Sequence, residues 1–189
     1  MSMRVRAGEA FSLEELAAYY YEPQGYNITE PSARERVSVA MGESIPDVHS
    51  IADLSAGPAM IPRYLASLTG ATLILGDYAP GYELEGPILE TIASITFVDL
   101  FVCTETLEHL DDPEANLRAI RPKCANLLVS TPIDQPIETA GGGHYWVWSR
   151  SDVEQMLVET GFMPQAFVEL DMTLGWMPGY VKFGIWVCR

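Results

Sequence analysis

The chain has 189 residues and a formal net charge of −15, and 48% of its residues are hydrophobic against 20% charged. These proportions are typical of a globular protein with a sizeable core, and they exclude a disordered chain. A surface this acidic disfavours binding to nucleic acid, because such binding depends on Lys and Arg. The sequence contains neither an apolar run long enough to span a bilayer nor a signal-peptide segment, so we expect a cytoplasmic protein without membrane contacts.

Residues 1–49 are expected to form an N-terminal helical segment. Ser12 and Glu15 have the spacing of a capping box at the start of the mostly apolar run 13–21. A second helix is predicted from near Thr29 to Met41, with a proline in its first turn.

From residue 50 onward, segments with strand and helix patterns alternate, which predicts an α/β fold with a mostly parallel sheet. One predicted helix has a capping box formed by Ser151 and Glu154. The last two strands have no helix between them and should close the sheet as an antiparallel hairpin. The expected strands are 50–54, 71–75, 98–103, 126–131, 165–170 and 180–188, and the expected helices are 63–68, a run from about 105, 114–120 and 153–160.

Three cysteines, Cys103, Cys124 and Cys188, are scattered along the chain. Their odd number argues against a disulfide framework. Because two of them lie in apolar runs that read as strands, we expect reduced and mostly buried thiols.

The strand at 98–103 leads directly into Glu105, Glu108 and His109. If the segment continues as a helix, the spacing i, i+3 and i+4 places these three side chains on one face. Ligands of open α/β sheets bind just outside the carboxyl ends of the strands. The spacing therefore indicates a functional site at this strand end.

A second candidate site follows the first strand. The small residues Ser55, Ala56 and Gly57 would let the backbone approach a ligand closely, and the helix that follows favours an anionic group. The alternative is a simple turn from strand to helix. The loop matches neither the phosphate-loop pattern nor G-x-G-x-x-G. Asp77 ends the second strand and is suited to accept hydrogen bonds from two ribose hydroxyls.

Four pieces of the chain resemble the class I S-adenosylmethionine-dependent methyltransferases, in particular the small-molecule type that includes ubiquinone-biosynthesis O-methyltransferases. Residues 53–59 resemble the family's D-L-G-C-G-x-G loop, and Asp77 matches its ribose-binding acid. Residues 97–117 resemble its fourth strand with the segment that follows, and residues 143–162 resemble the segment after its fifth strand. The resemblance covers 50–189.

The resemblance implies a Rossmann-like fold with a seven-stranded sheet in residues 50–189, covered by the N-terminal segment 1–49. It also implies S-adenosylmethionine as the cofactor. The residues expected to contact the cofactor are Asp53, Ser55, Ala56, Gly57, Asp77, Glu85, Gly86, Cys103, Thr104 and Glu105.

The chain departs from the family pattern on the adenine side of this site. The span from Asp77 to Asp99 is about half the usual length, so a helix after the second strand is expected to be missing. Pro87 stands where the family has an adenine-contacting acid, and it offers neither an N–H nor a carboxylate. Glu85 is the candidate replacement.

His109 and His144 are the candidate general bases, since both map to the strand-end rim. Some members of the resembled family bind a divalent metal through an E-x-x-E-H sequence. That would make Glu105, Glu108, His109 and His144 ligands here, a set that suits Mg, Mn, Fe or Zn. The alternative is that Glu105 contacts the cofactor while Glu108 and His109 hydrogen-bond to loops.

Together these features favour methyl transfer from S-adenosylmethionine to a small-molecule acceptor. One alternative is a non-catalytic protein of the same fold that acts as a partner subunit with a degraded cofactor site. Another is a metal-dependent nucleic-acid methyltransferase, against which the charge speaks. A homodimer or a protein partner stays open.

Overall fold

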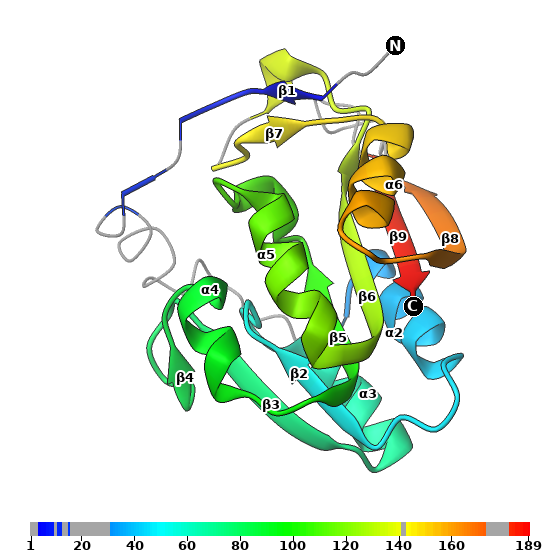
Figure 1. Ribbon diagram of the computed structural model, residues 1–189. Coiled ribbons are helices and arrows are strands. Elements are labelled where there is room, and N and C mark those ends of the chain that lie inside the picture. The colour runs from blue at the N-terminus through cyan, green and yellow to red at the C-terminus, as the bar shows by residue number, and fades with distance from the viewer. Residues whose placement is uncertain (1–3, 10, 13–14, 16–30, 141–142, 173–181) are drawn as a thin grey trace.

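A seven-stranded sheet in the order β4-β3-β2-β5-β6-β9-β8 forms the centre of the fold (Figure 1). The computed structural model describes residues 4–9, 11–12, 15, 31–140, 143–172 and 182–189. In sheet order, the strands are Leu84–Glu85 (β4), Thr72–Asp77 (β3), Ser50–Asp53 (β2), Val98–Thr104 (β5), Cys124–Ile133 (β6), Lys182–Cys188 (β9) and Pro164–Asp171 (β8).

The first five of these strands are parallel to one another, whereas β9 pairs antiparallel with both β6 and β8. The mostly parallel sheet and its closing hairpin are therefore confirmed. In the register of the parallel strands, Asp53 lies opposite Leu75 and Val102, and Asp77 lies opposite Glu85. The parallel pairing brings the carboxyl ends of β2, β3 and β5 to one edge of the sheet.

Helices cover both faces of the sheet (Figure 1). Alternate residues of β5 divide between two cores: Leu100 and Val102 face one, and Phe101 and Cys103 face the other. The first core is closed by α2 and α3, and the second by α4, α5 and α6. Because both faces of the strand are buried, its sequence is almost continuously apolar. The helices are Ala33–Glu43 (α2), Met60–Thr69 (α3), Ile88–Thr91 (α4), Pro113–Ile120 (α5) and Arg150–Glu159 (α6).

The connection between β3 and β5 is short, as the sequence predicts. It contains only the two-residue strand β4, the single turn of α4 and a 3-10 turn at Ile92–Ser94. Ile88 and Ile92 are buried in the core, which is why this brief helix stays on the sheet.

The N-terminal segment is not helical throughout, which corrects the prediction for 1–49. Val5–Arg6 form strand β1, which pairs antiparallel with Trp146–Val147 (β7) in a separate two-stranded sheet. Arg4, from the same segment, lies over the Trp146 ring and forms an ion pair with Glu114. The arginine charge and the aromatic face hold the segment extended.

The capping box at Ser12 and Glu15 is confirmed by reciprocal bonds: Ser12 N–H donates to Glu15 Oε2 at 2.8 Å, and Glu15 N–H donates to Ser12 Oγ at 3.2 Å. The helix expected after it lies outside the described residues, except for Glu15 itself. The next helix, α2, is capped by Ser32 with Glu35. The predicted start near Thr29 also lies outside the described residues.

The predicted capping box of α6 was placed two residues too late. Ser149, not Ser151, is the N-cap, and its partner is Asp152 rather than Glu154. Both pairs have the same spacing, but Glu154 accepts from Arg150 Nε at 2.7 Å and from Trp186 Nε1 at 3.3 Å instead of completing a box with Ser151.

Cys103, Cys124 and Cys188 are buried and unbridged, which confirms the expected thiols. Burial raises the pKa of all three thiols, to about 12 for Cys124 and Cys188. Among the described residues, no helix combines the length and apolar character that a membrane span requires.

The position of the α6 cap can be tested by mutation. Ser149→Ala removes the N-cap oxygen and should lower the free energy of unfolding by about 1 kcal/mol. For a chain of this size, that corresponds to a fall in Tm of roughly 2–4 °C in calorimetry. The exposed Ser151→Ala is the matched control and should stay within about 0.5 kcal/mol of the wild type. A larger loss for Ser151→Ala would contradict the assignment.

Candidate functional site

Two aspartates at the strand ends organise the loop after β2. Asp77 accepts hydrogen bonds from Gly57 N–H at 2.7 Å (Oδ2) and from Ala79 N–H at 2.8 Å (Oδ1). Asp53 accepts one from Ser55 N–H at 3.0 Å. Gly57 has a φ of 49°, a left-handed conformation that a residue without Cβ adopts readily. The predicted loop residues and both acids thus lie together at one strand edge.

Asp53 is buried, and burial raises the pKa of its carboxyl to about 7. The hydrogen bond from Ser55 N–H opposes this rise, and the charge of Asp77 adds to it. At neutral pH the carboxyl is therefore poised between its charged and uncharged forms.

The loop after β2 is bonded directly to the segment that follows β5. The hydroxyls of Ser55 and Thr106 lie 2.8 Å apart, and Thr106 Oγ1 also donates to Thr104 O at 3.1 Å. Thr104 is half-buried, whereas Cys103 is fully buried and offers a ligand no part of its side chain. The cofactor loop and the carboxylate-rich segment therefore form one continuous site.

On the β3 side, Glu85 and Gly86 lie beside Asp77. Gly86 N–H donates to Asp77 O at 3.0 Å, and the exposed Glu85 carboxylate accepts from Gly81 N–H at 2.9 Å. Tyr82 also reaches the loop, because its hydroxyl donates to Gly57 O. No sequence motif points to Tyr82, because the contact joins residues 25 positions apart.

The segment after β5 is not the helix that the sequence predicts. Glu105 adopts a φ of 53°, and its N–H donates to Ser130 O at 2.9 Å. A left-handed residue cannot continue an α-helix, so only the 3-10 turn Leu107–His109 follows. Glu105, Glu108 and His109 consequently do not share a helical face.

Glu105 is instead held by two partners away from the turn. Ser130 Oγ donates to its Oε1, and Arg34 Nη1 pairs with its Oε2, each at 2.8 Å. Burial, followed by the nearby charge of Glu108, raises the pKa of Glu105, although Arg34 opposes the rise. Arg34, which also lies over the Phe183 ring at 4.9 Å, is a site residue that sequence reasoning missed.

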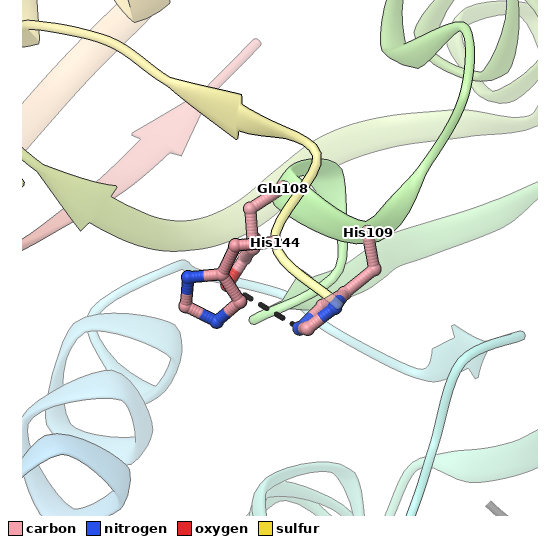
Figure 2. Close-up of side chains that lie close together, drawn as sticks. All are labelled: Glu108, His109 and His144. Atoms are coloured by element: carbon pink, nitrogen blue, oxygen red, sulfur yellow. Dashed lines mark ion pairs between the residues drawn. The ribbon is translucent and has the colours of Figure 1, made fainter. Parts of the chain in front are cut away.

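Glu108, His109 and His144 converge, as Figure 2 shows. Their donor atoms all lie within 4.8 Å of one another. Glu108 is 1% exposed; its Oε2 accepts from Thr131 Oγ1 at 3.0 Å, while its Oε1 is buried without a hydrogen-bond partner, 3.9 Å from His109 Nε2. Of the four predicted metal ligands, three are brought together, and Glu105 is not among them.

The two imidazoles are neutral near pH 7. Burial lowers the pKa of His109, and burial together with His109 lowers the pKa of His144 to about 4. His109 Nδ1 lies 3.0 Å from Gly143 O and His144 Nδ1 lies 3.1 Å from Gln135 Oε1. Because both oxygens only accept, each Nδ1 carries the hydrogen and each Nε2 carries the lone pair.

The arrangement is chemically suited to two tasks. Neutral imidazoles with Nε2 lone pairs can accept a proton from an acceptor group. The same two nitrogens and the Glu108 carboxylate form a mixed N/O donor set, and carbonyl or amide oxygens behind the imidazoles are typical of metal-binding histidines. Burial raises the pKa of Glu108, while the hydrogen bond from Thr131 opposes the rise.

The buried carboxyls predict a pH-dependent stability. The folded-state pKa of Asp53 is about 7, against about 4 for an unfolded chain, so the folded state binds the extra proton across this window. The stability that this proton contributes is present below pH 4 and is lost as the pH rises through 7. Asp53→Asn cannot ionise, so its Tm relative to the wild type should be higher at pH 8 than at pH 5 in calorimetry. A difference in Tm between Asp53→Asn and the wild type that is equal at pH 5 and pH 8 would contradict the assignment.

The sequence matches no model of a protein family and no curated protein sequence. Solved structures do match. Burkholderia thailandensis 1,6-didemethyltoxoflavin-N1-methyltransferase, with S-adenosylhomocysteine and 1,6-didemethyltoxoflavin bound, is 14% identical with a TM-score of 0.70, over 96% of this chain and 92% of that one. The N-methyltransferase NodS from Bradyrhizobium japonicum, in complex with S-adenosylhomocysteine, is 14% identical with a TM-score of 0.71, over 94% and 97%.

Human N-acetylserotonin methyltransferase, in complex with S-adenosylmethionine, is 16% identical with a TM-score of 0.62; the match covers 98% of this chain and 60% of that one. At these identities the likeness is one of fold, and it extends over nearly the whole chain. It agrees with the sheet order and the terminal hairpin described above. The chain therefore has the fold of the class I S-adenosylmethionine-dependent methyltransferases.

Proposed function

We propose that the protein transfers a methyl group from S-adenosylmethionine to a small-molecule acceptor. The observation that carries the proposal is the bond between Ser55 and Thr106, which joins the loop after β2 to the segment bearing Glu108 and His109. A cofactor seated on that loop would face the proton-accepting groups at the same strand edge. The bound S-adenosylhomocysteine in two of the similar structures supports the choice of cofactor.

The residues at the loop fit this cofactor. Each oxygen of Asp77 accepts one backbone hydrogen bond, and a carboxylate oxygen can accept a second, so both ribose hydroxyls could be bound without displacing Gly57 or Ala79. Ser55, Ala56 and Gly57 carry small side chains, which leave the backbone open to close approach.

The cofactor supplies a sulfonium methyl that is already activated, so the protein has mainly to align the acceptor and remove its proton. His109 and His144 are neutral at pH 7 and are our candidate proton acceptors. Gly143 O and Gln135 Oε1 hold the two rings in the tautomer that this role requires. The buried Glu108 would stabilise the imidazolium that forms.

Isothermal titration with S-adenosylhomocysteine tests the cofactor assignment. The wild type should bind saturably, and Asp77→Asn should weaken binding by about tenfold or more, because a charge-assisted acceptor is lost. The matched control is Glu83→Gln, an exposed acid on the same connection, which should bind like the wild type. Absence of binding to folded wild-type protein would overturn the proposal.

We also propose that Glu108, His109 and His144 can hold a divalent metal. The support is the buried Glu108 Oε1, which has no hydrogen-bond partner among the described atoms and lies on the side of the imidazoles. A cation would satisfy this oxygen, and it could orient acceptor oxygens next to the methyl group.

Titration with Mn²⁺ tests this second proposal. One site is expected, and His144→Ala should weaken it by at least the roughly 10- to 100-fold that loss of a supporting partner costs. His49→Ala, at an exposed histidine outside the site, is the matched control and should bind Mn²⁺ like the wild type. Equal affinities for both variants would show that any bound Mn²⁺ lies elsewhere.

A non-catalytic partner subunit is the second candidate function. It is favoured by the contact of Tyr82 with Gly57 O, which sets the shortened β3–β5 connection against the cofactor loop. If this contact excludes the cofactor, Tyr82→Phe should restore the binding of S-adenosylhomocysteine to a protein that otherwise fails to bind it.

A further inference from the structure

Arg34 holds Glu105, the one predicted metal ligand that does not join the Glu108–His109–His144 donor set. It lies in the first turn of α2, far from the site in sequence, and its Nη1 holds Glu105 Oε2 at 2.8 Å. The Phe183 ring supports the guanidinium from β9. The ion pair therefore links the N-terminal part of the chain to the end of β5.

Without Arg34, Glu105 would have a different environment. It lies three residues before Glu108 and interacts electrostatically with it. Two carboxylates this close repel each other unless a cation lies between them. Arg34 now supplies that cation for Glu105, and its charge reaches Glu108 as well. A divalent metal bound at Glu108 would compete with Arg34 for the Glu105 carboxylate.

The guanidinium has donors to spare. Its Nε has no hydrogen-bond partner among the described atoms but is buried, so an incoming anion would have to approach through the 29% of the side chain that is exposed. A guanidinium binds a carboxylate best through two parallel bonds, whereas the contact to Glu105 uses Nη1. An incoming anion that made a bidentate pair would therefore be a stronger partner than Glu105.

We propose that Arg34 is a positioning residue that withholds Glu105 from the metal site, and that an anionic group of the acceptor releases Glu105 by binding Arg34. The inference rests on the metal site proposed above. It implies an acceptor that carries a carboxylate or a similar anion, in a protein whose net charge of −15 would otherwise repel it. The released Glu105 adds a second carboxylate to the donor set, and hard divalent cations favour oxygen ligands.

A double-mutant cycle with Mn²⁺ titration tests the proposal. Arg34→Met should raise the affinity for Mn²⁺ by about 5- to 100-fold, the usual range for coupled sites. Removing a positive charge would also raise the affinity without any movement of Glu105, so the substitution is repeated in Glu105→Gln. There the gain should shrink to about threefold or less. Equal gains in the two backgrounds would overturn the proposal.

Arg34→Lys controls for the loss of packing against Phe183, because it keeps the charge and can still hold Glu105. Its Mn²⁺ affinity should stay close to that of the wild type, and calorimetry on each variant checks that the protein folds. A gain in Arg34→Lys as large as that in Arg34→Met would also overturn the proposal.

The release step has its own probe. Sodium acetate, compared with sodium chloride at equal ionic strength, should raise the Mn²⁺ affinity of the wild type but not that of Arg34→Met. An unchanged wild-type affinity would overturn the release by an anion.

If no variant binds Mn²⁺, the metal site is wrong and the inference falls with it. If the wild type binds Mn²⁺ and Arg34→Met does not change the affinity, only the inference is wrong.

Discussion

The geometry of the site depends on the turn at Glu105. Its N–H is bonded to Ser130 O on the neighbouring strand, and its positive φ ends β5 without starting a helix. The single 3-10 turn that follows then directs Glu108 toward Thr131 and His109 toward the loop at Gly143. Had the chain entered an α-helix, the two glutamates would share a face. The strained turn separates them and gives each carboxylate its own partners.

The fold could be predicted from the sequence because its main signals are local. Apolar runs such as 98–103 are long enough to indicate buried strands. The missing helix after β3 is visible in the sequence because the span from Asp77 to Asp99 is too short to contain it. The predictions were wrong where two sequence patterns fit the same segment or where a strand depends on a distant partner. Ser149 and Ser151 both have an acidic residue three positions later, and this local pattern does not distinguish them, because the partners that Glu154 takes are set by the tertiary structure. Strand β1 depends on its pairing with β7, which no local pattern reveals.

The site was predictable in part, for the same reason. The loop at Ser55 and the acids Asp53 and Asp77 follow strands directly, so their meeting at one edge follows from parallel pairing. The meeting of His109 with His144 was suggested only by the resemblance. Arg34 and Tyr82 were missed because their partners lie 71 and 25 residues away and belong to no motif. Long-range polar contacts of this kind are fixed by tertiary packing, and sequence periodicity carries no information about them.

The burial of the three cysteines has a practical consequence for experiments. A thiol reacts with electrophiles as its thiolate, and burial keeps Cys103, Cys124 and Cys188 both protonated and out of contact with solvent. The three native cysteines should therefore not react with thiol reagents while the protein is folded. A single cysteine introduced on an exposed surface would accept a fluorophore or spin label selectively, with no need to replace the native ones.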